Sequence, residues 1–156
     1  MAVLFCRKRK ISFLNFADYL VPYLALGQSI GRWGNFINQE AYGSITNSFF
    51  KMTIFEAELG EFVNVHPTFL YESVLDFFIF LILMLERKKR KFPGQLLLSY
   101  LILYGIGRAI IENFRADSLM LGSIRVSGLV GVISAIFGIC FWIFVECCRR
   151  KGKNVD

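Results

Sequence analysis

Four polar side chains recur at helical spacing within an apolar stretch, and their chemistry suits an anion. Tyr104, Arg108, Glu112 and Arg115 are separated by four, four and three residues, which places them on one face of a helix. A charged side chain within a bilayer costs about 2.5–3.5 kcal/mol on the insertion scale, so it usually faces a partner or a watered cavity. Guanidinium groups suit phosphate. A self-neutralising Arg108–Glu112 pair is the alternative, but it leaves Tyr104 and Arg115 unexplained.

Acidic side chains mark the beginning of a second apolar stretch, which starts near Pro67. This proline suits the first position of a helix, with His66 before it and Glu72 and Asp76 in its first turns. The histidine alone fits a helix cap better than a catalyst. Buried carboxylates, in contrast, require partners. The arginines of the first group are the available partners of both Glu72 and Asp76, and we expect Glu72 to support them.

A third polar group lies in "GRWGNFINQEAYG", residues 31–43. Arg32 offers a planar fork for phosphate, and Asn35 and Glu40 offer hydrogen-bonding groups. The three glycines of this segment, of which Gly43 is the last, are expected to permit tight turns or close backbone approach. A polar turn between two spans would have a similar composition. Together with the arginines of the first group, the segment predicts one wall of a phosphate pocket.

Membrane helices are the elements that must position these residues. Of the 156 residues, 55% are hydrophobic, and the mean hydropathy is +0.51, which fits lipid better than a soluble exterior. Apolar stretches cover residues 1–5, 13–37, 67–85, 96–114 and 126–145. The second is interrupted by polar residues and a proline, and is either a kinked span or a partly interfacial helix. We predict a single all-α, polytopic integral membrane domain over residues 1–156. It has about four transmembrane or interfacial helices, a partial N-terminal helix and a small extracytoplasmic loop region.

The basic residues predict the orientation of these helices. Thirteen of the 18 lie in three runs beside apolar stretches, at residues 7–10, 87–91 and 149–153. The net charge of +6 therefore reflects juxtamembrane anchors, and no nucleic-acid partner is predicted. The positive-inside rule places all three runs, and the C-terminus, in the cytoplasm. Segments 38–65 and 116–123 and the arginines then lie at the extracytoplasmic face, with a short strand expected at 49–56.

Cysteines add no further chemistry to this picture. Cys6, Cys140, Cys147 and Cys148 lie in or beside apolar segments on the predicted cytoplasmic side. A disulfide framework is not expected there, and no spacing matches a metal site. The sequence therefore calls for no metal and no cofactor.

The three polar segments carry a resemblance to a known family. "GRWGNFINQEAYG" at 31–43, "HPTFLYE" at 66–72 and "YGIGRAIIENFR" at 104–115 resemble, in order and roughly in spacing, three motifs of the bacterial prolipoprotein diacylglyceryl transferases. The resemblance extends over essentially the whole chain. It implies a transferase of the bacterial inner membrane that moves the diacylglyceryl group of phosphatidylglycerol to the lipobox cysteine thiol of a prolipoprotein signal peptide. This is the first step of lipoprotein maturation, and glycerol phosphate is the other product.

The resemblance also implies roles for the matching residues. Family members have essential residues that correspond here to Arg32, Asn35, Glu40, Gly43, Tyr104, Arg108 and Glu112. We expect the catalytic residues to be Arg32, Arg108, Tyr104 and Glu112. We expect phosphatidylglycerol to contact Arg32, Asn35, Glu40, Gly43, Arg108 and Arg115. His66 and Glu72 are expected to support them.

One part of the family pattern is absent from this sequence. The family has additional N-terminal spans, one of which carries a His-Gly-Gly motif with an important histidine, and the base for the thiol proton is therefore left open. The stub at residues 1–5 fits the tail of such a span, so the sequence resembles the C-terminal part of a larger transferase. The rival interpretation is a non-enzymatic phospholipid- or anion-binding membrane protein, a transporter fragment, or an inactive truncated transferase.

Overall fold

The computed structural model describes residues 2–56, 60–115, 120–121 and 124–153, which are mostly helical. The helices in these ranges are α1 (Ala2–Arg9), α2 (Phe13–Asn38), α3 (Thr68–Arg87), α4 (Gln95–Ile111) and α5 (Val126–Lys153). A short 3-10 helix, η1 (Glu112–Phe114), continues α4. Two antiparallel hairpins complete the described elements: β1 (Met52–Glu56) with β2 (Glu61–Val65), and β3 (Met120–Leu121) with β4 (Ile124–Arg125).

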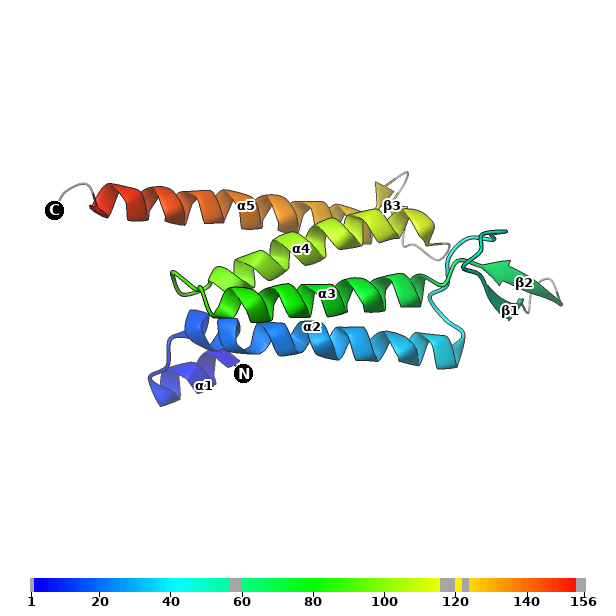
Figure 1. Cartoon of the computed structure of the whole chain (residues 1–156), viewed down its shortest axis with the longest axis horizontal. Coiled ribbons are helices and arrows are strands. Elements are labelled where there is room, and N and C mark those ends of the chain that lie inside the picture. The colour runs from blue at the N-terminus through cyan, green and yellow to red at the C-terminus, as the bar shows by residue number, and fades with distance from the viewer. Residues whose placement is uncertain (1, 57–59, 116–119, 122–123, 154–156) are drawn as a thin grey trace.

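The four long helices run side by side, with the hairpins at one end (Figure 1). Helix α3 contacts α2 and α4, α2 also contacts α4, and α5 packs mainly against α4. Three segments are long and apolar enough to cross a membrane: Thr68–Arg87, Gln95–Phe114 and Val126–Lys151. The predicted all-α polytopic membrane class is confirmed.

Helix α2 resolves the ambiguity of the 13–37 stretch. It is one helix of 26 residues, about 39 Å long at 1.5 Å per residue, and Pro22 lies buried inside it. It is not among the three segments that qualify as spans by hydropathy, because polar residues interrupt it. It nevertheless packs along α3 and α4, and its buried residues face the centre of the bundle.

The three basic runs lie at the same end of the bundle. Figure 1 places α1, the α3–α4 connection and the C-terminal end of α5 together, opposite the β1–β2 hairpin. Segment 7–10 spans the end of α1, 87–91 begins at the last residue of α3, and 149–153 ends α5. The alternating directions of the helices that the charge pattern predicts are therefore present in the fold.

The expected strand at 49–56 is only part of a larger element. Strand β1 begins at Met52, and it pairs with β2, which the sequence analysis did not predict. Alternation explains the hairpin: Ile54 and Val65 are buried, whereas Phe55 and Phe62 point outward as an exposed cross-strand pair. Because the exposed face carries phenylalanine, the apolar–polar alternation that indicates a strand does not stand out in this sequence. Of the predicted loop at 116–123, only the two residues of β3 lie within the described residues.

Polar side chains and glycines join the helices. Ser29 of α2 and Ser73 of α3 exchange hydrogen bonds, each hydroxyl donating to the other residue's carbonyl at 2.8 and 2.9 Å. Helices α4 and α5 meet at Gly105 and Gly131, where a Cβ on Gly105 would lie 2.4 Å from the Gly131 carbonyl oxygen. Small residues allow such close approach between membrane helices. The serines thus join α2 to α3, and the glycines bring α4, which carries Tyr104 and Arg108, close to α5.

Asp18 of α2 caps the beginning of α4. Its side chain is 2% exposed, and its Oδ2 and Oδ1 accept hydrogen bonds from the backbone N–H groups of Gly94 (2.7 Å) and Leu97 (3.0 Å). Arg90 Nη1 lies 3.3 Å from Oδ2. The first N–H groups of a helix have no partner within the helix, so a carboxylate from another helix supplies the N-terminal cap here.

We expect Asp18→Ala to destabilise the protein by about 2 kcal/mol, the upper end of a lost helix cap, because two N–H groups in the first turn of α4 lose their acceptor. Thermal unfolding in detergent, followed by helical circular dichroism, measures this. Asn15→Ala is the matched control, because Asn15 accepts a hydrogen bond from the same Arg90 (2.7 Å) but is exposed. Equal unfolding temperatures for the two variants would contradict the capping role.

Candidate functional site

The carboxylate of Glu72 gathers three arginines at the hairpin end of the bundle. Arg32 Nη2 lies 2.6 Å from Oε2, Arg108 Nη1 lies 2.6 Å from Oε1, and Arg115 Nη1 lies 3.5 Å from Oε1. The three arginines come from α2, α4 and the residue after η1. Glu72 is buried, with 5% of its surface exposed. The predicted partnership between this carboxylate and the arginines is therefore present.

Helical periodicity explains how Glu72 reaches the interior. Phe69, Glu72, Asp76, Ile79 and Leu83 are spaced by three or four residues, and all are buried. Such residues form one stripe along a helix. Toward the basic end of α3, this stripe is part of the apolar core. Toward the hairpin end, the same stripe places the carboxylates of Glu72 and Asp76 inside the protein.

A second buried carboxylate, Glu112, contacts Arg108 as well. Its Oε2 lies 3.3 Å from Arg108 Nη2, which is also 3.3 Å from Ser127 Oγ of α5. Arg125 donates a hydrogen bond to the Glu112 backbone carbonyl. Ser127 was not among the residues predicted from the sequence. Its signal would have been a hydroxyl near the beginning of an otherwise apolar helix.

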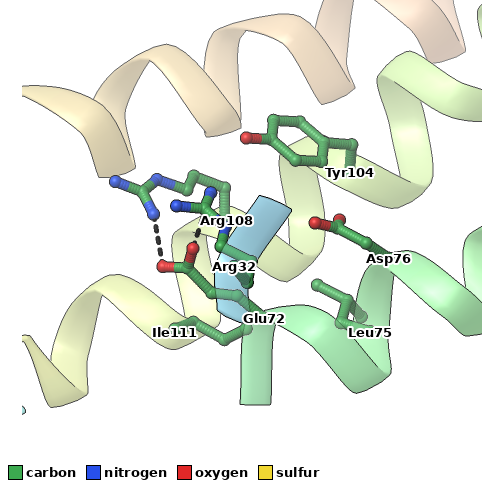
Figure 2. A pocket seen from close by; sticks show the side chains of 7 residues that line it. All are labelled: Arg32, Glu72, Leu75, Asp76, Tyr104, Arg108 and Ile111. Atoms are coloured by element: carbon green, nitrogen blue, oxygen red, sulfur yellow. Dashed lines mark hydrogen bonds and ion pairs between the residues drawn. The ribbon is translucent and has the colours of Figure 1, made fainter. Parts of the chain in front are cut away.

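A small cavity lies beside this network. It has a volume of about 10 Å³ and is lined by Arg32, Glu72, Leu75, Asp76, Tyr104, Arg108 and Ile111. Figure 2 shows Arg32, Tyr104 and Arg108 converging on it with the two carboxylates of α3. A groove of about 340 Å³ between α4 and α5 shares Tyr104 and Arg108 with this cavity, and is otherwise lined by small and apolar residues and two serines.

Asn35 and Glu40 lie outside this network. Asn35, in the last turn of α2, contributes its backbone carbonyl to the end of the helix by accepting the N–H of Glu40 at 3.0 Å. The Glu40 side chain is exposed and accepts a hydrogen bond from Asn38 Nδ2 at 3.2 Å. The structure therefore brings together Arg32, Glu72, Tyr104, Arg108, Glu112 and Arg115. The binding roles of Asn35 and Glu40 stay predictions.

Gly43 and His66 lie where three segments of the chain meet, around residues 43, 66 and 114–115. The N–H of Gly43 donates to the His66 carbonyl (2.9 Å), and Gly43 forms a β-bridge with Arg115. The His66 ring contacts the Phe114 ring, with centroids 5.6 Å apart, and its Nδ1 lies 3.3 Å from Tyr71 Oη. Gly43 thus aligns the chain at Arg115.

The glycines of the 31–43 segment do not act as one group. Gly31 and Gly34 lie within α2, and a Cβ at either would meet nothing within 4 Å. The left-handed backbone conformations of this segment belong to Gln39 (φ 52°) and Ala41 (φ 54°). The expected tight turns at glycines are therefore wrong for the first two, because the helix continues to Asn38 before the chain turns.

We expect Gly43→Ala to destabilise the protein by about 1–3 kcal/mol, the typical effect of overpacking. A Cβ there would lie 2.6 Å from His66 Cβ and 2.7 Å from the Phe114 carbonyl oxygen. Gly31→Ala is the control, and should be neutral or stabilising by up to about 1 kcal/mol because alanine favours a helix more than glycine does. Thermal unfolding in detergent compares the two. A neutral Gly43→Ala would show that the three segments are not tightly joined.

The charge of the cluster favours an anion. Arg32, Arg108, Arg115 and Arg125 bring four positive charges, and the nearby carboxylates Glu72, Asp76 and Glu112 bring three negative ones. The carboxylates hold the guanidinium groups in place, and the excess positive charge can meet a phosphate. Among the described residues, no group of three or more His, Cys, Asp and Glu side chains is arranged to hold a metal ion.

Fold and site together define the class: a multi-pass helical membrane protein with a buried arginine–carboxylate centre near one end. Comparison with known proteins is more specific. The model of the prolipoprotein diacylglyceryl transferase family matches residues 1–144. This chain therefore belongs to the prolipoprotein diacylglyceryl transferase family.

Individual relatives agree with this assignment. The phosphatidylglycerol–prolipoprotein diacylglyceryl transferase of Finegoldia magna is 50% identical over 139 residues, which cover 88% of this chain and 54% of the relative. The enzyme of the same name from Clostridioides difficile is 43% identical over 97% of this chain and 57% of the relative. One from Clostridium perfringens is 39% identical, with 99% and 62% covered. The chain thus spans between half and two thirds of the length of these relatives.

Proposed function

We propose that this chain is a single membrane domain corresponding to the C-terminal part of a phosphatidylglycerol–prolipoprotein diacylglyceryl transferase. It transfers the diacylglyceryl group of phosphatidylglycerol to the lipobox cysteine of a prolipoprotein signal peptide. The observation that carries this proposal is the buried Glu72 carboxylate, which holds Arg32, Arg108 and Arg115 from separate segments. Family membership supplies the substrate class for this arginine cluster.

The arrangement of the basic runs supports a location for the site. All three runs share one end of the bundle, and the arginine cluster lies toward the other (Figure 1). By the positive-inside rule, the runs and the C-terminus face the cytoplasm. The cluster then opens toward the extracytoplasmic face of the bacterial inner membrane, the side on which lipoprotein precursors emerge.

The reaction is a displacement at a glyceryl carbon. The cysteine sulfur forms a bond to this carbon, the bond from the carbon to the phosphate oxygen breaks, and glycerol phosphate leaves with the electron pair. The thiol proton passes to a base that stays unassigned. Because the leaving group gains negative charge in a site of low dielectric, fixed guanidinium groups stabilise the transition state more than the ground state.

The contacts suggest how the residues share this task. Arg32 and Arg108 bind the phosphate, because Glu72 fixes both guanidinium groups at 2.6 Å, and Arg115 adds positive charge near them. Glu72 and Glu112 hold Arg108 at 2.6 and 3.3 Å. Tyr104, which faces both the cavity and the groove between α4 and α5, orients the head group.

A chimeric enzyme tests the proposal most directly. This chain would replace the matching part of the Finegoldia magna relative and be reconstituted in phosphatidylglycerol vesicles with a lipobox peptide. We expect diacylglyceryl transfer to the peptide thiol, detected as a mass increase, and no transfer to a Cys→Ser peptide. Phosphate flux across the vesicles without transfer would support the rival interpretation as an anion-binding or transport protein instead.

A further inference from the structure

The side chain of Asp76 lines the small cavity of the site, but the proposed reaction gives it no role. Its side chain is 1% exposed, and its Oδ2 has no hydrogen-bond partner within the described part of the chain. Figure 2 shows the carboxylate pointing into the small cavity beneath Tyr104. Glu72, one turn earlier, takes three arginines. No ion pair of Asp76 is recorded among the residues that the structure describes, so the expectation that both carboxylates pair with arginines holds for Glu72 alone. A buried acceptor left without a donor is costly, so it indicates a missing hydrogen-bond partner.

The cavity limits what that partner can be. Its volume of about 10 Å³ accommodates a single oxygen the size of a water molecule. The group must donate a proton to Asp76 and can accept one from Arg32, Arg108 or Tyr104, which line the same space. A hydroxyl does both. A phosphodiester oxygen only accepts and would be repelled by the carboxylate, whereas an ammonium only donates and would be repelled by the two arginines.

The neighbouring groove indicates where such a hydroxyl would come from. The apolar groove between α4 and α5 meets the cavity at Tyr104 and Arg108. An acyl chain in the groove would bring its phosphate to Arg108, and the far end of the head group would then reach toward Asp76. The charges of the site therefore favour two different groups. The guanidinium groups favour the phosphate, and the Asp76 carboxylate favours a hydrogen-bond donor at the far end of the head group.

We propose that Asp76 is a specificity-determining residue that accepts a hydrogen bond from a hydroxyl of the phosphatidylglycerol head group. This inference rests on the proposed function. It adds the selection of a hydroxylated head group to the binding of its phosphate. A lipid that carries phosphate without a head-group hydroxyl leaves the Asp76 carboxylate unpaired, and a site built for a hydroxyl rejects the analogue that lacks it.

Competition between two lipids tests this inference without requiring turnover. The purified chain in detergent is given equal amounts of phosphatidylglycerol and phosphatidylpropanol with the same acyl chains, and native mass spectrometry counts the lipid retained. The wild type should prefer phosphatidylglycerol by at least about tenfold, the value of one good hydrogen bond. Asp76→Ala should reduce this ratio to about one. Asp76→Asn, which keeps an acceptor oxygen, should retain part of it.

Glu86→Gln provides the control on the same helix, because Glu86 lies near the other end of α3 and binds Gln95 (2.6 Å); its preference should equal that of the wild type. Helical circular dichroism verifies that each variant is folded. An unchanged preference in folded Asp76→Ala would overturn the role of Asp76 and leave the proposed function intact. A wild type that binds neither lipid, or binds both equally, would count against the phosphatidylglycerol pocket itself, and the role of Asp76 would fall with it.

Discussion

Replacing Arg108 by alanine should lower the rate of diacylglyceryl transfer by about 10²–10³-fold, the usual effect of removing a fixed donor to a developing anion. Arg108 contacts Glu72, Glu112 and Ser127. It also lines both the cavity and the groove. Its loss therefore removes a positive charge at the point where lipid and phosphate meet. Transfer to a lipobox peptide by the chimeric enzyme measures the effect.

Two further variants separate charge from geometry. Arg108→Lys keeps the charge but loses the planar fork, so its rate should lie between those of wild type and Arg108→Ala. Arg149→Ala removes an arginine at the opposite end of the bundle, where it contacts Glu146 at 3.4 Å, and should leave the rate unchanged. A normal transfer rate for Arg108→Ala would refute its assignment to the phosphate.

Replacing Glu72 by glutamine should destabilise the protein by about 3–5 kcal/mol, as expected when one partner of a buried ion pair is removed. The guanidinium groups of Arg32, Arg108 and Arg115 lose the carboxylate that they share. They stay close together with less negative charge beside them. Their mutual repulsion should separate α2 from α4 near the hairpin end. Thermal unfolding in detergent should show a large fall in the midpoint temperature.

Glu146→Gln is the matched control for this effect. Glu146 also contacts two arginines, Arg149 (3.4 Å) and Arg150 (3.6 Å), but its side chain is 32% exposed. Exposed pairs of this kind contribute about 0–1 kcal/mol, so the midpoint should barely move. If Glu72→Gln behaved like Glu146→Gln, Glu72 would not be the centre that holds the cluster.

The spans and the general place of the site could be predicted because their signals are local. Runs of apolar residues mark α3, α4 and α5, and basic runs mark their common end. The spacing of Arg108 and Glu112 on one helix predicted their contact. The demand of a buried carboxylate for cations predicted the partnership of Glu72, although the pattern did not say that one carboxylate would serve three arginines.

The rest depends on contacts between distant segments. Gly43 was predicted to bind lipid. In the structure, a side chain at this position would collide with residues 66 and 114, which only the fold brings near it. Ser127 lies on a different helix from Arg108, so no spacing connects them. The polar end of α2 resembled a loop because composition does not distinguish the polar last turns of a helix from a turn.

The cap of α4 has a consequence for how the protein is made. Asp18 precedes Gly94 by 76 residues, so α2 and its carboxylate leave the ribosome well before the first turn of α4 does. When α4 enters the membrane, its unpaired N–H groups meet an acceptor that is already present. The cap of α4 therefore does not have to wait for any later part of the chain, because its acceptor is synthesised first.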